Sequence, residues 1–336
     1  MTVASDVDVT PHQVSVVVPV YQGERSLEAL VDEILPWTKE FLTPAGRSAR
    51  IAEVLFVYDH GPDRSDQVIR KLAARFDFVH AVWLSRNFGQ HAGTLAGMAS
   101  SGGDWIATLD EDGQHDPAAI GAMLDVALDR QATLVYARPT NPPPHGFARN
   151  TASRGAKWVT RKVIGGGQAS SYHSFRLVLG EIGRSVAAYA GSGVYLDVAL
   201  EWVSGEIALC PVAMRVEADR HSGYSIRSLA SHFWRMVLTS GTRGLRMVSI
   251  LGGLLGLCGV IVAVWLVISR LMSDETPQGW TSTIVVVLLS GGAILVSLGI
   301  VAEYIGVAVN MAMGKPLYLI VGDPQKGPLG RDGRRS

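Results

Sequence analysis

The chain has 336 residues, of which 48% are hydrophobic and 18% charged, and its 30 basic and 30 acidic side chains give no net charge. This length suits one large domain or two ordinary ones, and the balanced charge excludes any global signal for a nucleic-acid partner. The two cysteines, Cys210 and Cys258, exclude a disulfide framework and a cysteine-based zinc site.

The first residues are predicted to form a flexible N-terminus over 1–12. The first fifteen residues include Asp6 and Asp8 and have no apolar core, which excludes a signal peptide. We therefore expect the globular part of the chain to stay in the cytoplasm.

Short apolar runs alternate with helical patterns up to about residue 140. Such alternation predicts an α/β fold with an open, mainly parallel sheet, whose ligands bind beyond the carboxyl ends of the strands. Asp59, Asn87 and Asp110 fall at such predicted ends. Continuous apolar runs typical of strands buried on both faces, or shorter β-rich runs, lie at 13–21, 51–59, 80–85, 104–110 and 132–138.

The stretch TLDEDGQHDP (108–117) places three acidic residues in a row, from Asp110 to Asp112, directly after an apolar run. Three explanations compete: a calcium loop, a divalent-metal site for a phosphorylated substrate, and an acidic turn that caps the next helix. The calcium loop fails on spacing. An EF-hand that starts at Asp110 needs glycine at 115 and glutamate at 121, where the chain has His115 and Gly121.

The helix cap explains only part of this acidic stretch. Asp116 before Pro117 is a suitable N-cap with proline in the first helical position. Asp110 and Asp112, two positions apart at a strand end, can instead converge on one hard cation, with Gln114 adding a neutral oxygen. Mg²⁺ or Mn²⁺ held by few protein ligands usually completes its shell with substrate phosphate.

The C-terminal third contains two long stretches without charge. Twenty-three residues separate Arg246 from Arg270, and 27 separate Glu275 from Glu303, without a Lys, Arg, Asp or Glu among them. Each exceeds the roughly 20 apolar residues that cross a bilayer core. We therefore predict two transmembrane helices at 247–269 and 283–303; the alternative is a buried hairpin in a soluble core.

The flanks of these stretches indicate the orientation. The segment 227–246, predicted to be an amphipathic juxtamembrane helix, and the predicted cytoplasmic tail 304–336 are basic, whereas the connecting loop has Arg270 as its one basic residue. By the positive-inside rule, both ends lie in the cytoplasm. The sequence thus predicts a cytosolic α/β domain over 13–226, anchored in the plasma membrane by a two-span hairpin.

The order and spacing of four segments resemble those of family 2 glycosyltransferases: SVVVPVYQGERSLEALVDEI, EVLFVYDHGPDRSD, LSRNFGQHAGTLAGM and DWIATLDEDGQHDP. The resemblance is strongest to the branch that moves a sugar from a nucleotide to a polyprenyl phosphate, which includes dolichol-phosphate mannose synthases and bacterial undecaprenyl-phosphate glucosyltransferases. It covers about residues 13–230 and implies a Rossmann-like GT-A fold, an inverting transfer, a divalent cation (Mg²⁺ or Mn²⁺) and possible assembly into a homotetramer.

The resemblance also implies roles for individual residues. The donor, a UDP- or GDP-sugar, would bind at the first loop and after the second and fourth strands: Pro19, Tyr21, Glu24, Asp59 and Asp110. The metal positions are Asp110, Asp112 and Gln114, and the catalytic positions are Asp110, Asp112 and Arg220. The acceptor phosphate would meet Arg138, Arg149 and Ser153.

This chain departs from the family pattern at three places. The usual DDGSTD after the second strand is YDHGPD here, which weakens base and ribose assignments beyond Asp59. The lysine expected after Arg220 is absent, and Tyr224, Arg227 or no residue takes its place. Gln22 replaces the usual asparagine before Glu24.

A lipid phosphate as the acceptor also fits elementary chemistry. With a second pKa of about 6 it is anionic at neutral pH, so its attack on a sugar needs arginines to hold it more than a general base. Two rivals remain. A processive polysaccharide synthase would carry a Q-x-x-R-W motif and more spans, and a membrane carrier or lipid-translocation subunit would use the α/β domain only to sense nucleotide.

Overall fold

A computed structural model describes residues 10–140, 173–191, 195–215 and 279–328, together with scattered helical residues between 252 and 268. The predictions made for 1–9, for the juxtamembrane segment 227–246 and for residues 270–278 of the loop between the two spans lie outside the described residues.

The core of the described chain is a nine-stranded sheet with the order β8-β6-β7-β5-β1-β3-β4-β9, with β2 paired to β3 off this path. β1, β3, β4 and β5 pair in parallel, as do β6 and β8, whereas β2, β7 and β9 run antiparallel to their neighbours. The strands are β1 (His12–Val20), β2 (Phe41–Leu42), β3 (Ser48–Tyr58), β4 (Val79–Leu84), β5 (Trp105–Thr108), β6 (Leu134–Pro139), β7 (Arg176–Leu179), β8 (Ile207–Val212) and β9 (Ile320–Val321).

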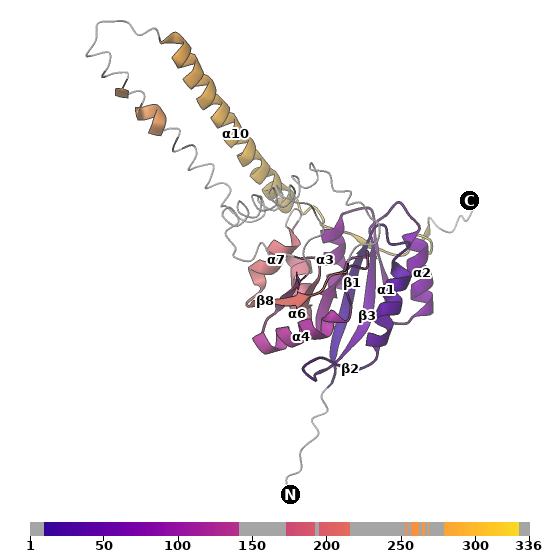
Figure 1. Cartoon of the computed structure of the whole chain (residues 1–336). Coiled ribbons are helices and arrows are strands. Elements are labelled where there is room, and N and C mark those ends of the chain that lie inside the picture. Colours follow the sequence, from indigo (N-terminus) through magenta and orange to yellow (C-terminus); the bar gives the residue numbers. More distant parts are fainter. Residues whose placement is uncertain are drawn as a thin grey trace.

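Helices cover both faces of the sheet and make three layers (Figure 1). One face packs against α1 (Leu27–Ile34), α2 (Ser65–Arg75) and α4 (Ala119–Arg130). The other packs against α3 (Gln90–Ser100), α6 (Gly180–Tyr189) and α7 (Leu196–Val203). The predicted α/β domain with a mostly parallel sheet is therefore confirmed.

Helix α3 lies unusually close to the central strand β1. A Cβ atom on Gly97 would come within 2.3 Å of Cγ1 of Val17, so only glycine allows this approach. The close packing brings the N-terminal end of α3 to the carboxyl edge of the sheet.

The strands predicted from apolar runs agree with the structure to within a few residues. Helix α4 begins at Ala119, two residues later than predicted, yet Asp116 Oδ1 accepts a hydrogen bond from the Ala118 N–H at 3.0 Å, as a cap would. Strands β2, β7, β8 and β9 were not predicted. Of these, β7 lies antiparallel between β5 and β6.

The long helix α10 (Trp280–Ala312) projects away from the α/β domain (Figure 1). It is longer than the span predicted at 283–303, because the sequence stays helix-compatible up to Gly314, whose φ of 63° ends it. Within it, Leu289–Asn310 is long and apolar enough to cross a membrane, and none of this stretch is buried. Such a helix is not part of a soluble core, and its apolar surface suits lipid.

The described part of the chain contains one such candidate helix. Of the other predicted span, 247–269, the structure describes only scattered residues, which are helical and exposed, among them Leu254 and Trp265. The two-helix hairpin thus stays a prediction.

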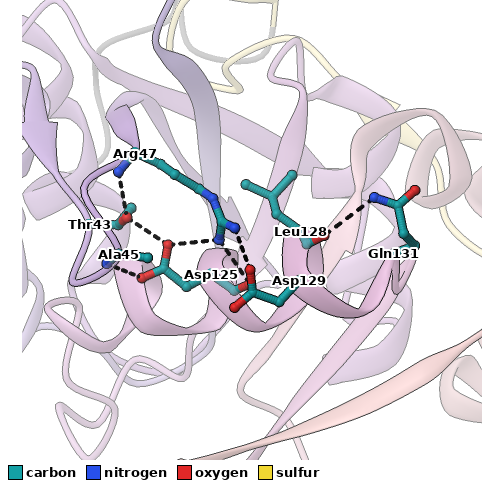
Figure 2. Close-up of polar contacts among 7 residues, drawn as sticks. All are labelled: Thr43, Ala45, Arg47, Asp125, Leu128, Asp129 and Gln131. Carbon is teal, nitrogen blue, oxygen red and sulfur yellow. Dashed lines mark hydrogen bonds and ion pairs between the residues drawn. The ribbon is translucent and has the colours of Figure 1, made fainter.

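At the edge of the sheet opposite to the carboxyl ends, Asp125 of α4 fixes the turn between β2 and β3 (Figure 2). Its carboxylate accepts hydrogen bonds from Thr43 Oγ1 at 2.6 Å, the Ala45 N–H at 2.8 Å and an Arg47 amino group at 3.2 Å. Arg47 also pairs with Asp129, whose side chain is 61% exposed, against 10% for that of Asp125.

We expect Asp125→Ala to destabilise the domain by about 2–4 kcal/mol, because it leaves a buried hydroxyl and an N–H without their acceptor. Asp129→Ala is the matched control and should cost less than about 1 kcal/mol, since its ion pair is exposed. Urea unfolding measures both changes. Equal losses in the two variants would show that the turn is not held by Asp125.

Candidate functional site

The residues predicted to bind a ligand gather at the carboxyl edge of the sheet. In the registers of the parallel strands, Val20 pairs with Tyr58 and Val17 with Thr108, so the segments after β1, β3 and β5 leave the sheet side by side. Pro19 is the buried residue near the end of β1, whereas Tyr21 and Glu24 are exposed. The edge therefore brings the predicted donor residues near the acidic turn.

Asp110 is held by donors from two other elements. Ser174 Oγ donates to its Oδ2 at 2.5 Å, and Gln90 Nε2 donates to its Oδ1 at 2.6 Å. Burial raises the pKa of Asp110, against the opposing effects of the Ser174 hydrogen bond and the nearby Arg176 guanidinium. Keeping this carboxylate ionised at neutral pH is thus easier when a further positive charge is near.

Glu111, the next residue, contacts the loop that follows β1. Its Oε2 accepts the N–H of Tyr21 at 2.9 Å, and its Oε1 accepts the N–H of Gln22 at 3.0 Å. The acidic turn and the first loop are therefore one unit. No role was predicted for Glu111, and its position inside the acidic run was the only available signal.

The rest of the turn is held by local bonds and by Arg215. Asp112 Oδ1 accepts the N–H of Gln114 at 3.0 Å. Arg215 donates its backbone N–H to the Gln114 carbonyl at 3.1 Å, and its guanidinium pairs with Asp116 at 3.2 Å and with Glu33 of α1 at 2.7 Å. Arg215, which was not predicted, thus ties the turn to α1.

Asp59 has a different environment from the one expected of a residue that contacts a base. Its side chain is buried, and its two oxygens accept the N–H groups of Phe88 and Gly89, each at 2.7 Å. Burial raises its pKa, while these two hydrogen bonds lower it. In this structure Asp59 shapes the loop that leads into α3, and its donor-binding role stays a prediction.

A layer of buried polar side chains lies beneath Asp110. His115 accepts the Asp110 N–H through Nδ1 at 3.0 Å, and its ring stacks on Phe175. Burial lowers the pKa of His115 to about 4, so the ring is neutral at physiological pH.

An ion pair anchors the same layer. Arg176 pairs with Asp197 of α7 at 2.6 Å, and both side chains are about 4% exposed. Asp197 also accepts the hydroxyl of Tyr136 at 2.8 Å. This pair joins β7 to α7 directly behind Ser174, the donor to Asp110.

The donor set of the turn fits a hard cation. Asp110, Asp112 and Gln114 offer carboxylate and amide oxygens, and burial of Asp110 favours a nearby positive charge. Within the part of the chain that the structure describes, no group of three or more His, Cys, Asp or Glu side chains is placed to hold a metal ion. A cation here would therefore depend on oxygens from its substrate as well.

Of the predicted acceptor residues, only Arg138 belongs to the described part. It lies exposed near the end of β6, which β7 separates from β5 along the same sheet. Arg149, Ser153 and Arg220, and the possible substitutes Tyr224 and Arg227, lie outside the described residues.

Comparison with known proteins finds one sequence family that matches part of the chain. Residues 15–178 match the sequence model of Glycosyl transferase family 2. An undecaprenyl-phosphate 4-deoxy-4-formamido-L-arabinose transferase from Pseudomonas paraeruginosa is 29% identical over 317 residues, which are 91% of this chain and 89% of that protein. Its namesake from Photorhabdus laumondii is 26% identical and covers 93% of this chain and 95% of its own.

Solved structures are less similar. Glucosyl-3-phosphoglycerate synthase from Mycobacterium tuberculosis, in complex with Mn²⁺, UDP and glucosyl-3-phosphoglycerate, has a TM-score of 0.46 and 17% identity and covers 69% of this chain and 80% of its own. Staphylococcus aureus TarS in complex with UDP-GlcNAc has a TM-score of 0.47 and 12% identity, covering 68% and 66% of the two chains.

We expect Glu111→Ala to weaken nucleotide binding by about tenfold, because two backbone N–H groups of the first loop lose their acceptor. Glu28→Ala, on the exposed side of α1, makes the same change in charge and should leave binding unchanged. Titration with UDP and GDP measures both variants. Unchanged affinity in Glu111→Ala would show that the contact of the acidic turn with the first loop does not support nucleotide binding.

Proposed function

The chain carries a glycosyl transferase family 2 domain and is a glycosyltransferase; from this premise we propose that it transfers one sugar from a nucleotide sugar to undecaprenyl phosphate at the cytoplasmic face of the membrane. The product would be a lipid-linked monosaccharide. The observation that carries the proposal is the joining of the acidic turn to the first loop at the carboxyl edge of the sheet, through Glu111.

The acceptor assignment draws on the curated relatives and on the apolar helix. The relatives that match 91% or more of this chain are named for undecaprenyl phosphate as their acceptor. Helix α10 provides an unburied stretch long enough to span a bilayer. A water-insoluble acceptor requires a site near the headgroups, and the anchor, which we propose to be a two-span hairpin with both ends in the cytoplasm, would supply it.

In the proposed reaction, an anionic oxygen of the lipid phosphate attacks the anomeric carbon in line with the leaving group. The new C–O bond forms as the bond to the nucleoside diphosphate breaks, and the diphosphate leaves with the electron pair. The configuration is inverted. No proton has to move, because the acceptor is already ionised at neutral pH.

The residues of the chain have separate roles in this proposal. The loop after β1, with Pro19, Tyr21 and Glu24, would hold the nucleotide. Asp110 and Asp112, with Gln114, would hold Mg²⁺ or Mn²⁺, whose charge would stabilise the leaving diphosphate. Ser174 and Gln90 orient Asp110 through the two hydrogen bonds that its oxygens accept.

The acceptor side would depend on arginines. Arg138 near the end of β6, with Arg149 and Ser153, would bind the lipid phosphate, and Arg220 would assist near the reacting groups. Guanidinium groups suit this task because they bind phosphate oxygens in a bidentate manner.

We expect the Asp110→Asn/Asp112→Asn double variant to lose at least about 100-fold in turnover while it stays folded, because the amides no longer attract a cation. EDTA should abolish wild-type turnover, and Mn²⁺ or Mg²⁺ should restore it. The Asp104→Asn variant, altered at the opposite end of β5, is the control for charge. Wild-type turnover in the double variant would remove the metal assignment.

The reaction itself is tested with detergent-purified protein, Mn²⁺ and a panel of UDP- and GDP-sugars that includes nucleotide-linked 4-deoxy-4-formamido-L-arabinose. We expect nucleotide release from one donor only when undecaprenyl phosphate is present, with the labelled sugar entering the lipid phase. Release without lipid would indicate another acceptor. Nucleotide binding without release from any donor would favour a sensing or carrier role.

A further inference from the structure

The chain returns to the α/β domain after α10. Strand β9 pairs antiparallel with the end of β4, Ile320 opposite Leu84 and Val321 opposite Trp83. The Ser85 N–H donates to the Leu319 carbonyl at 2.9 Å. This segment, residues 317–328, is here named the C-terminal strap. It covers the β4 edge of the sheet, which would otherwise present unpaired backbone groups.

The strap is fastened by one arginine on α2. Arg70 Nε donates to both oxygens of Asp323 at 3.1 Å, and one of its amino groups lies 2.9 Å from Asp323 Oδ1. Its guanidinium also pairs with Asp66 at 2.6 Å and lies 4.6 Å from the ring centre of Trp83. The Asp323 side chain is only 10% exposed, so the pair is shielded from water and is more than a surface contact.

At its other end the strap meets the helical layer. Leu317 and Tyr318 pack against the core on the side of α3, α6 and α7, and the Tyr318 hydroxyl donates to the Ala187 carbonyl of α6 at 3.4 Å. The strap therefore crosses from one face of the domain to the other, directly after the helix that is proposed to span the membrane.

The part of β4 that the strap grips is in contact with the predicted donor loops. The His60 ring donates through Nε2 to the Leu84 carbonyl at 2.7 Å, and His60 has the unusual φ of 51° for a residue other than glycine. The next residue, Gly61, touches the first loop: a Cβ atom there would lie 1.5 Å from the Tyr21 carbonyl oxygen. Contacts thus run from the strap through Leu84 and His60 to Tyr21.

We propose that the C-terminal strap is part of the scaffold of the donor site, and that Arg70 and Asp323 are positioning residues for nucleotide-sugar binding. By fixing the end of β4, the strap holds His60, and His60 holds the segment that supports the first loop. The inference rests on the proposed function, since it needs a nucleotide sugar at this edge. It also means that the strap connects α10, the proposed membrane anchor, to the donor site.

The test uses the full chain in detergent and two variants, Asp323→Asn and Arg70→Gln. We expect each to raise the Kd for UDP or GDP, whichever the wild type binds, by roughly fivefold or more. The donor KM should rise in parallel, while kcat and the KM for the lipid stay within about twofold. Asp323→Glu keeps the charge and should recover much of the affinity.

Asp66→Asn is the matched control. It removes the other carboxylate partner of Arg70 and leaves the strap contacts in place, so its donor affinity should equal that of the wild type. If Asp323→Asn lowers the thermal stability but leaves donor Kd and KM unchanged, the strap is only a structural brace and the inference is overturned. A wild type that binds neither UDP nor GDP would instead overturn the proposed donor chemistry, and the inference with it.

Discussion

The need of four carboxylates for hydrogen-bond donors is the constraint on which the functional edge of this protein depends. They follow strand β5 within seven residues, at 110, 111, 112 and 116. Each is offset by a donor from a different place: Ser174 and Gln90 for the first, the backbone after β1 for the second, the turn itself for the third and Arg215 for the last. Hydrogen bonds and ion pairs thus connect the loop after β1, α1, α3 and the segment before β7 to one turn. In the proposed function, the first and the third would share one cation.

The central fold could be predicted from the sequence because parallel strands buried on both faces appear as continuous apolar runs. The runs around Val16, Phe56 and Ile106 are of this kind, and these three side chains are fully buried. The antiparallel strands could not be predicted in the same way. Strand β7 has four residues and β9 has two, so neither shows a period, and both are defined by partners far away in the chain. Short strands of this kind are specified by pairing and not by local pattern.

The candidate site could likewise be predicted only in part. The type and spacing of the acidic residues were visible in the sequence, since two carboxylates after a strand suit a cation whatever surrounds them. Their partners were not visible. Glu111 and Tyr21 are 90 residues apart in the chain, and Ser174 and Asp110 are 64 apart, so only the folded sheet brings them into contact. Asp59 had a predictable position at a strand end, but its partners were not predictable. The hydrogen bonds that it accepts from two backbone N–H groups depend on the path of the following loop.

The number of residues after α10 limits the distance between the end of this helix, the proposed anchor, and the α/β domain. Tyr318, which contacts α6, follows the end of α10 at Ala312 by six positions in the chain. An extended chain covers at most about 3.6 Å per residue, so the domain surface lies within about 22 Å of the helix end. A lipid acceptor keeps its tails in the bilayer and can offer its phosphate only at the headgroup level. In the proposed function, a short connection fastened by Arg70 and Asp323 would hold the carboxyl edge of the sheet near that level, whereas a long flexible linker would not. The same strap that pairs with the edge of the sheet would thus keep the proposed site within reach of the acceptor phosphate.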